Sequence, residues 1–536
     1  MREGNTSPCT VNKTSSNLTH DFLGSPLYMR SRVFAFTFLL AILSQPGPCS
    51  EITQGITLPD MGSTAGSALS PMEERKLGDA FMRNIRQNVK LVDDPLIEDY
   101  ITSLGNLLVG FAGYHPFDFS FFMVDDLRIN AFAGPGGYIG VNSGLILNSE
   151  SESELASVLS HELAHVTQHH LVRSFEAANK LSIPTAAAVI AAIILGARNP
   201  QAAEALLAAG VAGNAQSQLS FSRQHEQEAD RIGIETLFQA GFNPRAMPAF
   251  FERLQQASRF VESGAPEFLS THPVTLSRIA DSRNRAEQFQ FKQITDSVEY
   301  QLMRARLQYL SDTQKPDQRV KFYERNLASG KFRSELAARY AYILALIDRN
   351  DYATARSQIV ELLRRDKERV PYFAVQAQIE TRSGNTKQAI EILQHALQLY
   401  PHNTPLTLQM GELLINSGSA QQAHALLLNQ GRFENSNPAY YQLLARSAER
   451  LNDQREAHEA LAEYHYLFGR TALAVEHLQT ALRQLNTSFY MKSRIEARLK
   501  VLQDELRPLL QNKSGDNTRD PRFNSVLKSI LNKVNW

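Results

Sequence analysis

Cysteine is almost absent from this chain of 536 residues, which contains only Cys9 and Cys49. Both precede the part that is expected to fold, so the mature protein is predicted to have no disulfide bond and no cysteine metal site. Charge of one sign is also lacking, because 55 lysine and arginine residues balance 55 aspartate and glutamate residues. The composition therefore gives no reason to expect nucleic acid or an acidic substrate.

Long hydrophobic runs are scarce as well. The apolar segment Val33–Leu43 has eleven residues, too few to span a bilayer, and it follows the basic stretch Met29–Arg32. This combination is typical of a signal peptide. We therefore expect residues 1–28 to be an upstream extension, translation to start at Met29, and residues 29–50 to be a signal peptide that exports the protein. An uncleaved anchor is the alternative.

A second apolar segment, Leu181–Ala197, contains Pro184 and is followed by the alanine-rich stretch Ala202–Ala212. Its seventeen residues are marginal for a transmembrane helix. We expect a helical hairpin that packs on a folded domain. A lid, or a surface that contacts a membrane or a partner, is the second interpretation, and an integral membrane span is the third.

The strongest motif lies in the segment Ser151–Val172, where leucine and valine recur at three- and four-residue steps and predict an amphipathic helix. Inside this segment, His161, Glu162 and His165 form an HExxH motif. Four residues of helix return a side chain to nearly the same face, so His161 and His165 can bind one metal ion. Glu162 can reach a water molecule on that metal without being a ligand itself.

A catalytic zinc site needs three protein ligands and an open position for water. Leu171 stands where the extended HExxHxxGxxH pattern has its third histidine. The helix is expected to run on through His169 and His170. We interpret His169 as a flank, because a rigid helix cannot aim three successive i+4 residues at one tetrahedral ion. A structural helix with surface histidines is the alternative interpretation of the whole motif.

A better third ligand lies in a second predicted helix around residues 221–231. Glu226 and Asp230 form an ExxxD pair with both carboxylates on one face. Glu226 is predicted to bind the metal, and Asp230 to accept the free N–H of a ligand histidine and so fix its tautomer. Glu228 points about 200° away from Glu226 on such a helix and is a poor candidate for a ligand.

HExxH followed by a downstream ExxxD resembles the gluzincin arrangement of zinc proteases. The long separation between the motifs, together with the segments around Asn130–Phe132 and Ser270–Pro273, is similar to the secreted branch of peptidase family M48. The resemblance implies an endopeptidase with one Zn²⁺ per subunit. It also implies that His272 lies near the active site, as a donor to the transition state or as a fourth ligand that keeps the enzyme latent. A plain loop histidine is the alternative.

Two strands are predicted before the HExxH helix, at Phe117–Val124 and Tyr138–Val141, with the turn Ala131–Gly137 between them. The glycine-rich second strand is well placed to be an open edge, to which an extended substrate adds through backbone hydrogen bonds. An ordinary hairpin is the equally weighted alternative. Arg231 is expected either close to His272 or paired with an acid.

After a linker predicted near Gln288–Thr313, the sequence becomes repetitive. Turn residues recur every 34 residues, and an alanine follows each of them by five residues. The turn positions are Asn350, Gly384, Gly418 and Asn452, and the alanines are Ala355, Ala389, Ala423 and Ala457. This period is the tetratricopeptide signature and predicts stacked helix pairs with a concave binding face. Gly469 and Ala474 repeat the pattern after only 17 residues, so one helix is expected to serve two units.

The predicted fold class is mainly α. An α+β gluzincin zinc-metalloprotease domain occupies residues 51–290, an all-α tetratricopeptide-repeat solenoid occupies residues 300–490, and residues 491–536 form a C-terminal helix and tail. The motifs favour a protease that its repeats bring to polypeptide clients.

The family resemblance implies a location in the periplasm. It also implies, as partners of the repeats, an outer-membrane beta-barrel assembly machine and lipopolysaccharide-transport proteins, with misassembled barrel proteins among the clients. Peripheral membrane contact through residues 181–213 stays open. Two other functions remain as alternatives: an assembly scaffold with a normally latent zinc site, and an integral inner-membrane quality-control protease.

Overall fold

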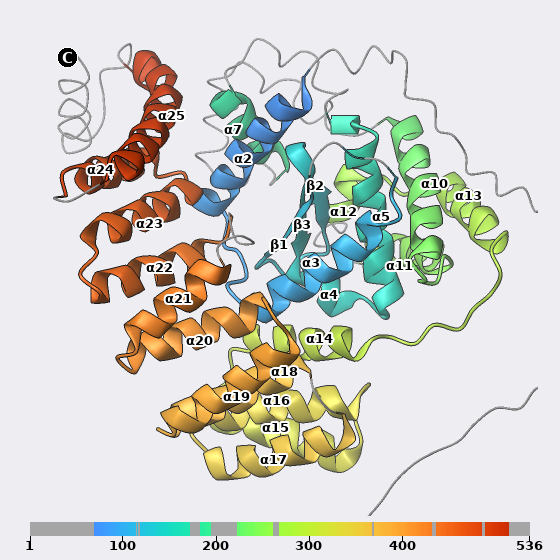
Figure 1. Cartoon of the computed structure of the whole chain (residues 1–536). Helices are drawn as coiled ribbons and strands as arrows, with labels where there is room; N and C mark the ends of the chain where they lie inside the picture. Colours follow the sequence, from blue (N-terminus) through green and yellow to red (C-terminus); the bar gives the residue numbers. More distant parts are fainter. Residues whose placement is uncertain are drawn as a thin grey trace, which may run out of the picture. The chain divides into compact units, whose positions relative to one another are not determined.

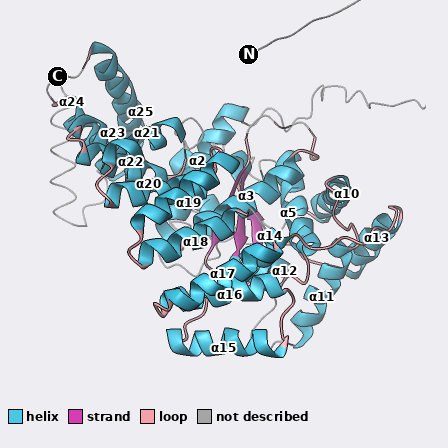
Figure 2. Cartoon of the chain, turned by 60° about the horizontal axis from the view of Figure 1, so that its bottom comes forward, coloured by secondary structure: helices cyan, strands magenta, loops and turns pink. Residues whose placement is uncertain are grey.

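The computed structural model describes residues 69–513 with eight gaps, and all of them belong to one compact unit of the chain (Figure 1). The gaps are residues 114, 116–117, 172–182, 195–221, 261–266, 367–368, 431–435 and 485–487. The predicted extension, the signal peptide and most of the tail therefore lie outside the described residues. Helices predominate around one small mixed sheet (Figure 2), which confirms the predicted fold class.

Two capped helices open the described part of the chain. Helix α2 (Pro71–Asn88) begins with a capping box, in which the Ser70 hydroxyl accepts the backbone N–H of Glu73 and the Glu73 carboxylate accepts that of Ser70. Helix α3 (Pro95–Val109) begins at Asp94, whose carboxylate accepts the N–H of Ile97. A proline in the first turn suits both starts, because the first N–H groups of a helix have no partner inside it.

The sheet has three strands in the order β1 (Ser120–Val124), β3 (Tyr138–Asn142) and β2 (Ala131–Ala133). Strand β3 is parallel to β1 and antiparallel to β2. The glycine-rich strand is therefore central, and the prediction that it is an open edge was wrong. Its glycine has a packing reason, because a Cβ at Gly140 would lie 2.3 Å from the ring of Phe132.

Two further details of this region differ from the prediction. Strand β1 starts at Ser120, three residues later than expected. The predicted turn contains the short strand β2, which lies at the edge of the sheet, and the short 3-10 helix η2 (Pro135–Gly137). Helix α4 (Ser143–Asn148) then leads from the sheet to the HExxH helix.

The HExxH motif lies on helix α5 (Glu152–Thr167), which is capped by Ser151. Every residue from Glu152 to Val166 is buried, because α5 packs between the sheet, α3, α10 and α11 (Figure 1). The helix is thus enclosed and not amphipathic. It also ends earlier than predicted, because Gln168 caps it and His169 takes a left-handed conformation with φ of 52°.

The apolar segment after α5 contributes helix α7 (Ile183–Ile194), which packs on α2. Its buried alanines and isoleucines share one apolar cluster with Leu77, Phe81 and Ile85. This helix agrees with the first half of the predicted hairpin, and the second half lies outside the described residues. None of the described helices combines the length and the apolar character needed to cross a membrane.

Four helices complete the catalytic part. Helix α10 carries the ExxxD pair and lies along α5, while α13 packs against both α10 and α11. Their bounds are α10 (Arg223–Gln239), α11 (Ala246–Phe260), α12 (Glu267–Thr271) and α13 (Leu276–Glu287).

Helix α14 (Val298–Leu310) occupies half of the region that was predicted to be a linker. It is ordered by packing, because it contacts α3, α4 and α16. Arg306 on α14 binds both carboxylate oxygens of Asp94 at 2.9 and 2.7 Å and reaches the hydroxyl of Tyr340 at 3.1 Å. The N-cap of α3 is therefore also the anchor of the first repeat helices.

The repeat helices follow as antiparallel neighbours, each packing on the next. They are α15 (Pro316–Ser329), α16 (Glu335–Asp348), α17 (Tyr352–Arg365), α18 (Val370–Arg382), α19 (Thr386–Leu399), α20 (Thr404–Asn416), α21 (Ala420–Gln430), α22 (Pro438–Arg450), α23 (Gln454–Leu467), α24 (Thr471–Leu482) and α25 (Phe489–Lys513). Helix α23 packs on both α22 and α24, as other helices of the array do on their neighbours, so the prediction that one helix serves two units stays a prediction.

The four turn positions of the 34-residue period share one backbone conformation. Asn350, Gly384, Gly418 and Asn452 all have φ between 61° and 86°, the left-handed region that glycine and asparagine tolerate best. The alanine five residues after each turn is buried. The periodic residues therefore act through a turn conformation and a close helix contact.

Three histidines cluster between α23 and α24. The Nδ1 atoms of His458 and His477 lie 2.8 Å apart, and the ring of His465 stacks on that of His477 at 5.1 Å. Burial, together with His465 and His458, lowers the pKa of His477 to about 4. Burial and nearby Arg483 lower the pKa of His458, although Glu449 opposes them.

We predict that these repeats lose stability in acid. A histidine whose pKa is about 6.5 unfolded and about 4 folded is neutral in both states above pH 6.5. As the pH falls from 6.5 toward 4, protonation favours the unfolded chain. Thermal unfolding in EDTA should therefore show a smaller acid-induced fall in midpoint for His477→Gln than for wild type. His402→Gln, at an exposed histidine, is the control; equal acid sensitivity of His477→Gln and wild type would contradict the prediction.

Candidate metal centre

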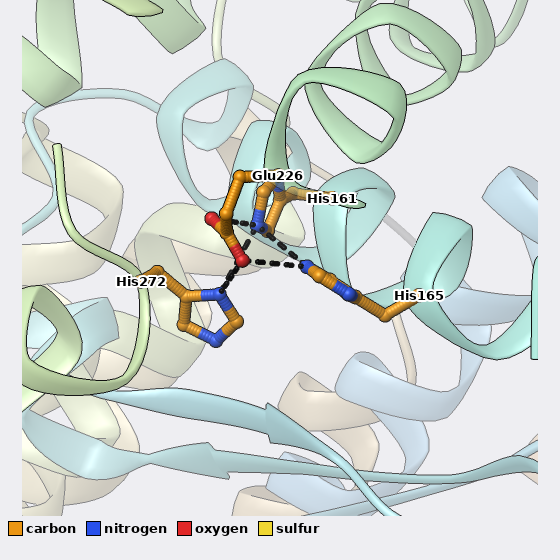
Figure 3. Close-up of side chains that lie close together, drawn as sticks. All are labelled: His161, His165, Glu226 and His272. Atoms are coloured by element: carbon orange, nitrogen blue, oxygen red, sulfur yellow. Dashed lines mark hydrogen bonds and ion pairs between the residues drawn. The ribbon is translucent and has the colours of Figure 1, made fainter. Parts of the chain in front are cut away.

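Four predicted side chains converge in the interior of the catalytic part. His161 and His165 come from α5, Glu226 from the first turn of α10, and His272 from the residue after α12 (Figure 3). All four are at most 2% exposed. One ligand atom of each lies within 4.8 Å of the others, and this is the only such group among the residues that the structure describes.

The distances inside the cluster suit a tetrahedral metal ion. The Nε2 atoms of His161 and His165 are 3.0 Å apart, and Glu226 places its carboxylate oxygens 3.6 Å from the first and 3.4 Å from the second. Ligands at 2.0–2.1 Å from a tetrahedral zinc ion are roughly 3.3 Å from one another. Two imidazoles and one carboxylate are also a donor set that catalytic zinc accepts. The residues present therefore fit Zn²⁺.

Close packing of α10 on α5 brings the two motifs together. Gly233 lies against the backbone of α5. A Cβ at this position would lie 3.1 Å from the backbone nitrogen of His161. One and two turns before Gly233, Asp230 and Glu226 face α5 from the same side of α10. Their spacing follows the helical repeat, which is why the ExxxD pattern could be recognised in the sequence.

Asp230 contacts His161 on the side away from the cluster. Its Oδ1 atom lies 3.0 Å from Nδ1 of His161, so it can accept the proton there and leave Nε2 for a metal. Arg278 holds this carboxylate through two hydrogen bonds of 2.8 and 2.7 Å. Arg278 also lies 2.6 Å from the Glu226 carboxylate and donates to the carbonyl of Pro273.

Sequence reasoning missed Arg278. It considered Arg231, either close to His272 or paired with an acid, and Arg231 is exposed on α10. Arg278 lies on α13, outside both motifs, and only the packing of α13 on α10 brings it to Asp230. No spacing rule links it to HExxH or ExxxD.

The pKa values of the buried side chains in the site depend on the charges and hydrogen bonds of their neighbours. Burial would lower the pKa of His161, but hydrogen bonds to Asp230 and Glu226 outweigh it and raise that pKa to about 9. Burial lowers the pKa of His165 well below its usual range. For Glu226, burial acts to raise the pKa, but the charge of His272 and the hydrogen bonds of three histidines hold it well below normal. The Glu226 carboxylate is thus kept ionised.

Glu162 is fully buried beside the cluster. Its Oε1 atom lies 3.4 Å from Nε2 of His272. Neither carboxylate oxygen makes a hydrogen bond with any residue in the described part of the chain. Burying a carboxylate that makes no hydrogen bond destabilises the folded protein. A structural role therefore does not explain Glu162. This arrangement is expected of a catalytic base, whose partner is a water molecule or substrate.

The two histidines after the motif have different surroundings. His169 contacts Glu74 of α2 at 3.3 Å and lies outside the cluster, where a flanking residue is expected. His170 is fully buried and places Nδ1 2.9 Å from Nδ1 of His165. Its Nε2 atom lies 3.1 Å from Glu228. Helical periodicity gave no signal for this contact, because α5 ends before His170.

Comparison with known proteins agrees with both halves of the fold. The profile described as "Peptidase family M48" matches residues 95–286, and the one described as "Tetratricopeptide repeat" matches residues 381–447. The "Beta-barrel assembly-enhancing protease" of Escherichia coli (strain K12) is 36% identical over 456 residues, 84% of this chain and 93% of that protein.

Two further relatives extend this comparison. The protein of the same name from Yersinia pestis is 35% identical over 481 residues, 88% of this chain and 97% of its own. The "Mitochondrial metalloendopeptidase OMA1" of Schizosaccharomyces pombe is 30% identical over 182 residues, which cover 34% of this chain and 50% of that protein.

We predict that Arg278→Ala destabilises the metal-free protein strongly. The substitution removes the guanidinium that the buried carboxylates of Asp230 and Glu226 share, which costs about 3–5 kcal/mol. Zinc supplies positive charge at the same place, so adding it should recover more of the lost thermal midpoint in the variant than it adds to wild type. Arg283→Ala on the same helix is the matched control, because its ion pair is exposed and worth about 0–1 kcal/mol. Equal losses in the two variants would contradict the prediction.

Proposed function

Because the chain belongs to peptidase family M48 and is a homologue of the beta-barrel assembly-enhancing proteases, we propose that it is a zinc-dependent endopeptidase of the periplasm. It would promote the assembly of outer-membrane beta-barrel proteins and degrade those that fail to assemble. The observation that carries the chemistry is the buried cluster of His161, His165 and Glu226 with the Glu162 carboxylate beside it.

His161, His165 and Glu226 would hold the zinc ion. When bound, zinc acidifies a water molecule and polarises the scissile carbonyl group. Glu162 takes the proton of the attacking water and passes it to the leaving amine, because its buried carboxylate has no competing hydrogen bond in the described part of the chain. Asp230 holds the Nδ1–H of His161, and Arg278 holds Asp230.

The outer strand β2 is the proposed site for an extended substrate. Strand β3 is paired on both of its sides, whereas β2 pairs with β3 alone among the described strands. Strand β2 also packs on α5, close to the motif that carries the metal ligands. A polypeptide added to β2 through backbone hydrogen bonds would be held with little dependence on its sequence, as a quality-control protease requires.

His272 is the proposed latch of the resting enzyme. Its Nδ1 atom lies 3.0 Å from Glu226 and 3.4 Å from His161, so with zinc bound it would be placed to take the position that a catalytic site keeps for water. A fourth protein ligand at that corner would leave the enzyme latent. When a client displaces this ring, His272 remains close enough to donate a hydrogen bond near Glu162.

The repeats are proposed to recruit clients and the outer-membrane beta-barrel assembly machine, with lipopolysaccharide-transport proteins as further partners. A stacked helical array with a concave face suits such a role. A second candidate is an assembly scaffold with a permanently latent zinc site. The same position of His272 in the cluster favours it, because the ring occupies the place of the water.

The first experiment measures zinc content and casein cleavage for the protein without its predicted leader (residues 51–536). We expect one zinc ion per chain. Glu162→Gln should keep the metal but lose activity by about 10²–10⁴-fold, because the base is removed and no ligand is. His272→Ala should keep the metal and cleave faster than wild type, since the fourth corner becomes free.

Each other outcome would change the conclusion. Zinc bound without cleavage in any variant would favour the scaffold. A protein that binds no zinc would refute the proposed chemistry. Arg283→Ala, which alters only an exposed ion pair on α13, controls for general effects of substitution and should match wild type in both measurements.

A further inference from the structure

We propose that His170 and Glu228 are positioning residues of the metal centre, which hold His165 as Asp230 and Arg278 hold His161. This inference rests on the proposed metal-binding role of His165. It concerns two residues to which neither the HExxH nor the ExxxD pattern gives a role.

The contacts form a chain that leads away from the cluster. Nε2 of His165 faces His161 and Glu226, while its Nδ1 atom lies 2.9 Å from Nδ1 of His170. Nε2 of His170 then lies 3.1 Å from a carboxylate oxygen of Glu228. His170 is fully buried, whereas the Glu228 side chain is 33% exposed, so the chain ends where a carboxylate stays hydrated.

Metal binding fixes the protons along this chain. If Nε2 of His165 binds a metal, its Nδ1 carries the proton of the neutral ring and must donate it. Nδ1 of His170 is then the acceptor, so the proton of His170 sits on Nε2 and is donated to Glu228. One tautomer of each ring satisfies the metal–His165, His165–His170 and His170–Glu228 contacts together. Glu228 favours this pair of tautomers because it accepts the hydrogen bond from Nε2 of His170.

Because α5 ends before His170, the His170 ring can contact His165. On an unbroken helix, a residue five positions after His165 would point roughly 140° away from it. The left-handed conformation of His169 breaks the helix and turns His170 back over His165. Contact between His169 and Glu74 of α2 holds this turn in place.

The pair also ties together the two helices that supply the ligands. Glu228 lies on α10 between Glu226 and Asp230, and it points past the end of α5 to reach His170. His225, one turn earlier, stacks on His170 with ring centroids 4.3 Å apart and planes 11° apart. The start of α10, where Glu226 sits, is thereby fixed against the end of α5, where His165 sits.

Zinc affinity is the quantity that tests this role. It is measured by competition with a chromophoric chelator on the purified full-length protein, beside the visible spectrum of the Co²⁺ form. His170→Ala should weaken zinc binding by about 10–100-fold, the usual effect of losing a partner of a ligand histidine. His170→Asn should recover part of this loss, because its carbonyl oxygen can accept the proton of His165.

Glu228 variants test the far end of this chain of contacts at a side chain that is only partly buried. Glu228→Ala should weaken zinc binding, and Glu228→Gln should do so less, because its carbonyl oxygen still accepts from His170. The double variant His170→Ala/Glu228→Ala should be no weaker than His170→Ala, since the two residues act in series. Glu235→Ala is the matched control: it removes an exposed carboxylate further along α10, and the affinity should not change.

The results separate this inference from the function on which it rests. Unchanged zinc affinity and an unchanged Co²⁺ spectrum in His170→Ala and Glu228→Ala would overturn the positioning role while leaving the metal centre intact. A loss in His170→Ala that asparagine does not recover, with Glu228→Ala like wild type, would reduce His170 to a packing residue and also overturn it. Wild-type protein that binds no zinc would overturn both.

Discussion

The packing of α5 against α10 is the contact on which the catalytic part depends. Because α5 is enclosed along its length, it carries the HExxH motif into the interior and not along a surface. Electrostatic interactions are stronger there, and unpaired charges cost more, so each buried carboxylate needs a partner inside the protein. Asp230 and Glu226 share Arg278 for this purpose. Glu162 is left without a hydrogen bond in the described part of the chain, and it is the residue that we propose as the catalytic base, which needs a free lone pair.

Side-chain contacts join the repeats to the catalytic part at two places. At the start of the repeats, Arg306 binds Asp94, the residue that caps α3. Far along the chain, Arg83 of α2 donates to the Tyr466 hydroxyl at 2.8 Å and stacks on its ring. Helix α2 also supplies Glu74 to His169, next to the metal centre. One helix therefore contacts the repeats on one side and the end of the HExxH segment on the other.

Those parts of the molecule that follow a local period could be predicted from the sequence. His161, His165, Glu226 and Asp230 come together as predicted, because i+4 spacing on a helix fixes a face. The repeat turns follow from the 34-residue period in the same way. The position of strand β3 could not be inferred, since glycine at an edge and Gly140 between two phenylalanine rings look alike in sequence. The roles of Arg278 and His170 depend on how one helix ends and on which helix packs against another, and neither follows a period.

The surroundings of the four clustered side chains bear on the latch that we propose for His272. His161 is held through Asp230, His165 through His170, and Glu226 by Arg278, so moving any of them breaks a buried contact behind it. His272 follows a helix of only five residues, and its ring stacks on Phe268 of that same helix. Phe268 is fully buried in the core, and the carbonyl of Pro273 accepts a hydrogen bond from Arg278, so the backbone on both sides of His272 is held and only its side chain is available to move. In the proposed latch, a rotation of the His272 side chain alone would free the fourth position while His161, His165 and Glu226 keep their contacts, so activation would require no rebuilding of the three-residue site.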